Sequence, residues 1–194
     1  MYSTRVSRHV NASRPAVYRA LLDPGAVATW RVPAGMSSHV HEFDAREGGA
    51  FRVSLTYDAP IATGKSRAHT DTYHGHFVRL VPNEQVVEVF EFDTADPALR
   101  GTMTMTTTLT DADGGTEVLV VHEGIPDSVP AADNETGTRM ALANLAQLVE
   151  AIGVTVRTAI TRSSASSVPG RSSSESFAEM DGDGVAVVLV DQVA

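Results

Sequence analysis

The sequence predicts an α+β domain in which a curved antiparallel sheet of about six or seven strands wraps one long C-terminal helix. Three observations predict it. Apolar and polar residues alternate with period two over residues 39–124, two short helical segments precede this region, and a helical apolar stripe follows residue 130. A chain of 194 residues, 42% of them hydrophobic, is long enough to build one well-packed domain.

The N-terminal elements are expected to be a strand and two short helices. Residues 3–10 alternate as a strand does. Ser13 is placed to cap a helix that Pro15 enters in its first turn, and Asp23-Pro24-Gly25 ends that helix. A second short helix is expected to reach Trp30.

Short turns divide the period-two region into the strands of an antiparallel meander. After the turn at Gly48-Gly49, Phe51, Val53 and Tyr57 share one face of a strand. Further strands, separated by turn residues, are expected at residues 73–81, 86–92, 103–109 and 118–122.

The C-terminal part of the chain combines a helix with a segment of different composition. Apolar residues recur with helical spacing from Ala141 to Ile152, and Gly153 is the expected end of this helix. We therefore expect a folded domain over residues 1–152. Residues 153–194 are expected to form a flexible, Ser-rich tail, with an extra strand open at residues 185–190.

Composition excludes several classes of protein. No cysteine is present, which removes disulfides, thiolate metal sites and cysteine nucleophiles. The formal net charge of −9 argues against a nucleic-acid partner, because such affinity needs a surplus of clustered Lys and Arg. Since no apolar run is long enough for a signal peptide or a membrane span, we expect a cytoplasmic protein without a membrane partner.

No metal or other cofactor is expected. Two His-x-His pairs, at residues 39–41 and 74–76, each place both rings on one strand face, a spacing that can hold zinc. The first pair shares the parity of Phe43 and is expected to face inward. The second pair has the opposite parity to Phe77, so it faces water if Phe77 packs in the core.

A cavity between the sheet and the C-terminal helix is the expected ligand site. His122 shares the parity of Val118 and Val120, which places its ring on the apolar face. Pockets for small molecules are lined mostly by apolar and aromatic residues with a few polar groups. The candidate ligand-binding residues are Trp30, His41, Phe43, Phe51, Val53, Tyr57, Phe90, Phe92, Met103, Met105, His122 and Leu145.

The chain resembles the START-like (SRPBCC) superfamily, and within it bacterial domains similar to the C-terminal domain of the heat-shock-protein-90 ATPase activator. The resemblance spans roughly residues 3–152 and is carried above all by FDAREGGAFR at residues 43–52, by Trp30, and by HEGIP at residues 122–126. It implies a helix-grip fold with an internal cavity. Two departures, Arg31 and Thr138, stand where the family often has tryptophan, and both are expected to touch the pocket or the final helix.

Three functions follow as hypotheses. The first is a non-catalytic module that binds a small lipophilic or aromatic molecule, since the sequence holds no complete catalytic constellation. The second is a cyclase-type or hydrolase-type enzyme with His122 or His41 as general base and Tyr57 or Glu123 assisting. The third is a co-chaperone-like or other protein-interaction role. A homodimer and a chaperone partner stay open.

Overall fold

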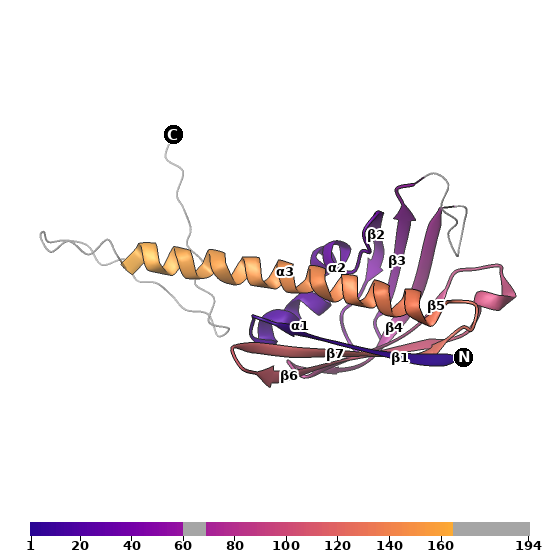
Figure 1. Cartoon of the computed structure of the whole chain (residues 1–194), viewed down its shortest axis with the longest axis horizontal. Coiled ribbons are helices and arrows are strands. Elements are labelled where there is room, and N and C mark those ends of the chain that lie inside the picture. Colours follow the sequence, from indigo (N-terminus) through magenta and orange to yellow (C-terminus); the bar gives the residue numbers. More distant parts are fainter. Residues whose placement is uncertain (60–68, 165–194) are drawn as a thin grey trace, which may run out of the picture.

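The computed structural model describes residues 1–59 and 69–164, and it shows the predicted α+β architecture (Figure 1). Seven antiparallel strands form one sheet in the order β1-β7-β6-β5-β4-β3-β2. The strands are β1 (Tyr2–Val10), β2 (Met36–Phe43), β3 (Ala50–Tyr57), β4 (Thr70–Val81), β5 (Gln85–Phe92), β6 (Met103–Ala112) and β7 (Gly115–Ile125). The helices are α1 (Arg14–Leu22), α2 (Pro24–Trp30), α3 (Ala131–Ser164) and the 3-10 turn η1 (Pro97–Leu99).

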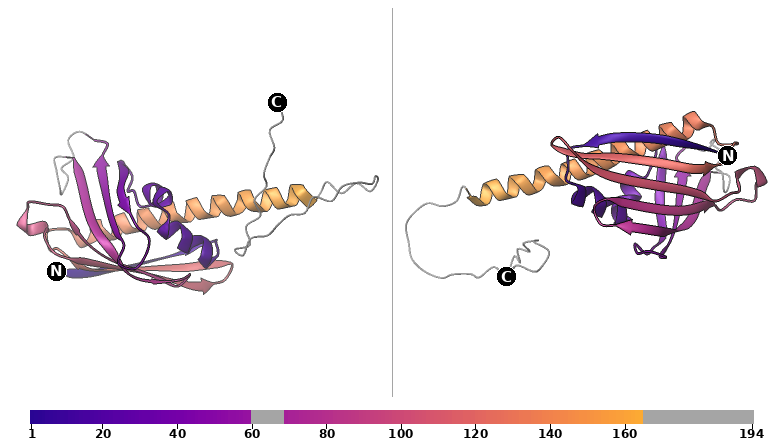
Figure 2. Two further views of the ribbon diagram at one scale, coloured as in Figure 1. Left: turned by 180° about the vertical axis from the view of Figure 1, so that it is seen from behind. Right: turned by 90° about the horizontal axis from the view of Figure 1, so that it is seen from below.

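The sheet curves around α3, which gives the helix-grip fold that the sequence predicts. Figures 1 and 2 show β1, β7 and β6 passing along one side of the helix, while β2 and β3 stand at a steep angle to them on another side. Helices α1 and α2 lie beside the middle of α3. The concave face of the sheet, α2 and α3 therefore enclose the interior of the domain.

The two short helices α1 and α2 form as the sequence predicts, apart from the side-chain cap of α1. Ser13 occupies the cap position of α1, but its side chain makes no capping hydrogen bond. Asp23 ends α1 and caps α2 instead, accepting a hydrogen bond from the Ala26 amide at 2.6 Å. The indole of Trp30 donates to the Ala20 carbonyl at 3.0 Å and so ties α2 back to α1.

The prediction that His39 and His41 face inward is wrong, because β2 contains a bulge. Val40 pairs with Val53, and the next pair along is Glu42 with Arg52, so His41 is the extra residue. Both histidines are exposed. The bulge resets the alternation, and for that reason Phe43 packs against the core although its sequence parity matches that of His41.

The second histidine pair lies as predicted. Phe77 is completely buried in the core. His74 and His76 lie on the opposite face of β4, where the His74 imidazole is 3.3 Å from the Glu91 carboxylate on β5. Among the described residues, no group of three or more His, Asp or Glu side chains is placed to hold a metal ion.

Helix α3 is longer than predicted. It begins at Ala131 and continues through Gly153 to Ser164, so the expected stop at Gly153 is wrong. Glycine inside a helix costs only about 1 kcal/mol relative to alanine, which does not by itself end a helix. The division into a domain at residues 1–152 and a tail stays a prediction, and the expected strand at 185–190 lies outside the described residues.

Candidate functional site

A cavity of about 510 Å³ lies between the concave face of the sheet, the segment after α2 and the first turns of α3. Its wall is mostly apolar and aromatic, with several polar groups. From the sheet come Met36, Leu55, Tyr57, Asp71, Tyr73, Phe90, Phe92, Met105 and His122; from the α2 end come Trp30, Arg31, Pro33 and Ala34; from α3 come Asp133, Asn134, Thr136, Gly137, Thr138, Met140 and Ala141.

Half of the predicted ligand-binding residues line this cavity. They are Trp30, Tyr57, Phe90, Phe92, Met105 and His122. The others lie elsewhere: Phe51, Val53, Met103 and Leu145 are completely buried in the core, Phe43 packs against that core, and His41 is exposed. Both departures from the family pattern, Arg31 and Thr138, line the cavity as predicted.

A buried ion pair crosses the cavity wall from the end of α2 to β5. The Arg31 guanidinium donates to both carboxylate oxygens of Glu88, at 2.9 and 2.6 Å, and also to the Met105 sulfur at 3.0 Å. Side-chain exposure is 12% for Arg31 and 6% for Glu88. Burial alone would lower the pKa of Arg31, but the Glu88 carboxylate outweighs it and the pKa is raised, so the guanidinium stays charged.

Three aromatic rings from the sheet contact one another in the cavity wall. The Phe90 ring lies between the Tyr73 ring, at a centroid distance of 5.6 Å, and the His122 ring, at 5.4 Å. The Arg31 guanidinium lies 5.8 Å from the Tyr73 ring centroid and 5.7 Å from that of Trp30. Strands β4, β5 and β7 thus contribute one ring each, and Arg31, directly after α2, places its cation beside the Tyr73 ring.

His122 is held by a hydrogen-bonded chain that reaches the edge strand. Its Nδ1 lies 3.0 Å from the Asn134 amide nitrogen, while the Asn134 carbonyl oxygen accepts a hydrogen bond from the Thr4 hydroxyl at 2.7 Å. Burial and the nearby charge of Arg31 lower the pKa of His122 to about 4, so the ring is neutral at pH 7. Its other nitrogen, Nε2, is buried and has no hydrogen-bond partner within residues 1–59 and 69–164.

Tyr73 and Tyr57 both line the cavity, and their hydroxyls differ. The Tyr57 hydroxyl donates to the Asp71 carboxylate at 3.3 Å. The Tyr73 hydroxyl is buried and has no hydrogen-bond partner in the part of the chain that the structure describes. Burial raises the pKa of Tyr73, and this outweighs the opposing charge of Arg31, so the hydroxyl keeps its proton.

The polar groups Tyr73, Glu88 and Asn134 were not found by sequence reasoning. Tyr73 begins one of the predicted strands and shares the parity of Phe77, which is the signal that could have placed it on the inward face. Glu88 alternates with Val86 and Phe90, which places a charge on the apolar face of β5. The sequence offered one sign of the buried Arg31–Glu88 ion pair: Glu88 lies at an inward position, and Arg31 stands where the family often has tryptophan.

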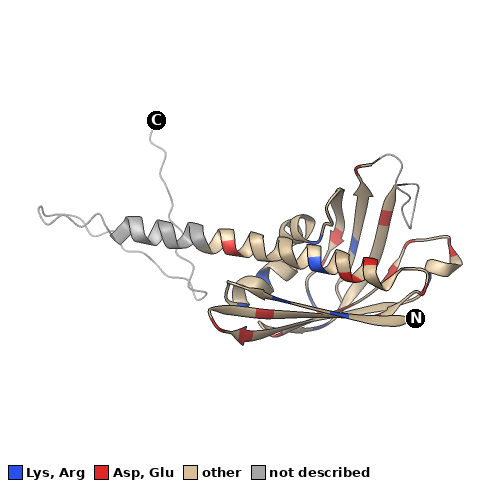
Figure 3. Ribbon diagram, viewed as in Figure 1, with Lys and Arg blue, Asp and Glu red and all other residues tan. Residues whose placement is uncertain are grey.

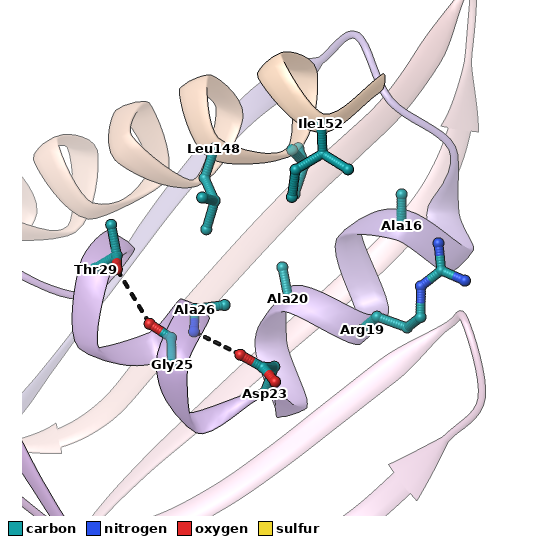
Figure 4. Close-up of a pocket in the computed structure, with 10 residues that line it drawn as sticks. Ala16, Arg19, Ala20, Asp23, Gly25, Ala26, Thr29, Leu148 and Ile152 are labelled. Carbon is teal, nitrogen blue, oxygen red and sulfur yellow. Dashed lines mark hydrogen bonds between the residues drawn. The ribbon is translucent and has the colours of Figure 1, made fainter. Parts of the chain in front are cut away.

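A second hollow, of about 410 Å³, lies between α1, α2 and α3 (Figure 4). Two of its three polar side chains are engaged: Asp23 caps α2, and the Thr29 hydroxyl donates to the Gly25 carbonyl at 3.1 Å. None of the buried unpaired side-chain atoms found in the described residues belongs to its wall. The cavity beneath α3 is therefore the better candidate for a specific ligand site.

Charge does not mark a different site. Figure 3 shows acidic residues on strands, loops and α3 alike, with basic residues interspersed. No helix among the described residues is both long and apolar enough to cross a membrane. The buried polar groups of the cavity thus remain the most distinctive chemical feature of the described residues.

A curved sheet that grips one helix above a cavity defines a START-like, helix-grip domain. The comparison with protein families narrows this class. The model of the family described as Activator of Hsp90 ATPase homolog 1-like protein matches residues 11–150, and the chain belongs to that family.

Solved structures show the same fold. A protein from Chromobacterium violaceum is 36% identical, with a TM-score of 0.69 over 76% of this chain and 96% of that one. A protein from Rhodobacter sphaeroides is 21% identical, with a TM-score of 0.65 over 78% and 93%. An AHSA1-like protein from Aeromonas hydrophila is 21% identical, with a TM-score of 0.58 over 78% and 94%. None of the curated proteins compared with the chain matches it.

Proposed function

We propose that the protein binds a small apolar or aromatic molecule in the cavity beneath α3, and that it does so in the cytoplasm. The observation that carries the proposal is the cavity itself: about 510 Å³, with Trp30, Phe90 and Phe92 in its wall. This volume falls within the roughly 300–1,000 Å³ typical of ligand pockets, and apolar walls with a few polar groups are typical as well. The helix-grip fold supports the same function.

The geometry favours binding over the catalytic alternative. His122 is the one predicted general base in the cavity, since His41 is exposed on the other side of the sheet. With a pKa of about 4, His122 is a weak base at pH 7, whereas general base catalysis works best with a pKa near the operating pH. The co-chaperone-like role stays a prediction.

Filling the cavity tests the proposed function. Gly137 of α3 lines the cavity, and a Cβ atom added there would meet no described atom within 4 Å. We expect Gly137→Leu to occupy the space and to lower the affinity for a bound lipophile at least about tenfold, with folding retained because leucine favours helix. The measurements are native mass spectrometry of freshly isolated protein and titration with hydrophobic fluorescent probes.

Gly153→Leu is the matched control. Gly153 lies in the same helix with equally open space around its Cα, but outside the cavity wall. It should gain the same helix propensity and leave binding unchanged. If wild type carries no small molecule and binds no probe, or if both variants bind as wild type does, the proposed function is wrong.

A further inference from the structure

Two polar groups in the cavity wall lack the partners that buried polar groups require. Tyr73 is 7% exposed and His122 is 6% exposed, and both line the cavity. The Tyr73 hydroxyl oxygen and the His122 Nε2 are closed off from solvent and hydrogen-bonded to no atom of the described residues. Because leaving such a group unpaired destabilises a folded protein, two of them in one cavity call for an explanation.

The neighbours of His122 make its free nitrogen a donor. The carbonyl oxygen of Asn134 accepts a hydrogen bond from the Thr4 hydroxyl, and the Asn134 NH₂ group faces Nδ1 of His122. An NH₂ group only donates, so Nδ1 accepts and the proton of the neutral ring lies on Nε2. The cavity therefore presents an N–H group at His122.

Tyr73 supplies a second donor on the other side of Phe90. Its hydroxyl keeps its proton at pH 7, and the Phe90 ring lies between the Tyr73 and His122 rings. The Phe90 ring can pack against an aromatic ligand. The N–H group of His122 and the O–H group of Tyr73, on either side of Phe90, can donate to oxygen acceptors on that ligand.

The charges of the wall disfavour an anion. Glu88 already neutralises Arg31 through two hydrogen bonds. Asp71 and Asp133 add negative charge to the same wall. A carboxylate or phosphate entering the cavity would meet this negative charge with no uncommitted cation among the described wall residues to balance it.

We propose that the ligand is a neutral aromatic compound with a hydrogen-bond-accepting oxygen, of the ketone or ether class, which pairs with the Tyr73 hydroxyl or with His122 Nε2. This inference rests on the proposed function and refines it. Since both atoms are closed off from solvent, the ligand must press wall side chains aside to reach them. Met105, unbranched and adjacent to Arg31, is suited to such a shift.

The test compares 9-fluorenone with fluorene, which share one ring skeleton and differ by a carbonyl in place of a methylene group. Affinities are measured by calorimetry for wild type, Tyr73→Phe, His122→Phe and the control Tyr57→Phe. Tyr57 lines the same cavity, but its hydroxyl is already paired with Asp71. Circular dichroism establishes that each variant is folded.

We expect wild type to bind fluorenone about five- to tenfold more tightly than fluorene, as one hydrogen bond predicts. Tyr73→Phe or His122→Phe should bring this ratio close to one, whereas Tyr57→Phe should keep the ratio. If wild type binds both compounds equally, or if the ratio survives both substitutions, the inference is wrong and the proposed function stands. Tighter binding of fluorene-9-carboxylate than of fluorenone would also overturn it. If wild type binds neither compound, the proposed function fails as well.

Discussion

Tyr73 and Tyr57 show how two residues of one type in one cavity can contribute differently to stability. The Tyr73 hydroxyl is buried without a partner, whereas the Tyr57 hydroxyl is bonded to Asp71. We expect Tyr73→Phe to raise the free energy of unfolding by about 1 kcal/mol, because it removes an unpaired buried group. Tyr57→Phe should lower it by a similar amount. Urea denaturation of both variants checks this, and a Tyr73→Phe variant clearly less stable than Tyr57→Phe would contradict it.

His122 should make the domain sensitive to acid. The ordinary histidine pKa is 6.5, and in the folded protein that of His122 is lowered to about 4. Between these values the unfolded chain binds a proton at His122 that the folded chain does not. The free energy of unfolding therefore falls as the pH falls, by about 3 kcal/mol in total from this one residue.

The contribution of His122 to the pH dependence of stability is obtained by comparing wild type with a variant that lacks the imidazole. Stability of wild type and His122→Gln is measured by urea denaturation between pH 7 and pH 4, and the wild-type curve should fall more steeply. His41→Gln, at an exposed position, should follow wild type. Parallel curves for wild type and His122→Gln would show that the imidazole titrates normally in the folded state.

At the scale of the elements, the Arg31–Glu88 pair joins the end of α2 to β5 across the cavity wall. Removing one partner leaves a buried charge unpaired, so we expect Glu88→Leu to lower the free energy of unfolding by about 3 kcal/mol. The double variant Arg31→Met/Glu88→Leu should recover most of that loss. Denaturant midpoints of the single and double variants provide the measurement.

An exposed ion pair serves as the comparison for Glu88→Leu. Arg139 and Glu135 form a pair with an N–O distance of 2.8 Å on the surface of α3. Arg139→Met should change stability by less than about 1 kcal/mol, because water screens exposed pairs. A loss at Glu88→Leu no larger than that at Arg139→Met would show that burial adds nothing to the pair.

Sequence patterns predict the elements well and fail where a single residue changes the geometry. The strands, the two short helices and the start of α3 after Pro130 follow from apolar periodicity and turn residues. The bulge at His41 could not be predicted, because it is a shift in the pairing of β2 with β3 and no residue type in the strand marks it. The continuation of α3 through Gly153 was missed because glycine lowers helix stability only modestly.

For the whole molecule, alternation along a strand gives the face of a side chain but not the depth of the space in front of it. Phe51 and Phe90 both point inward, and only Phe90 borders the cavity. The difference depends on where α3 passes over the curved sheet, which several distant segments decide together. Half of the residues predicted from the sequence therefore line the cavity, whereas the polar groups Tyr73, Glu88 and Asn134 emerged only from the packing of β4, β5 and α3.

A ligand that binds the folded domain alone must raise its melting temperature. At one hundred times its dissociation constant, such a ligand adds about 2.7 kcal/mol of stability. For a domain of this size we expect a rise of roughly 5–10 °C with fluorenone in wild type. Differential scanning calorimetry measures it, and Gly137→Leu should show no comparable rise. An equal rise in Gly137→Leu would place the compound outside the cavity.

The hydrogen bond between Thr4 and Asn134 links the outermost strand to the interior. Strand β1 contributes no described residue to the cavity wall, yet its Thr4 hydroxyl is hydrogen-bonded to the amide that faces His122 Nδ1. A Thr4→Val substitution, or cleavage that frees the first strand, would release that amide to turn over. The imidazole could then offer a lone pair where it now offers a proton, and ligand preference would be altered from a position outside the pocket.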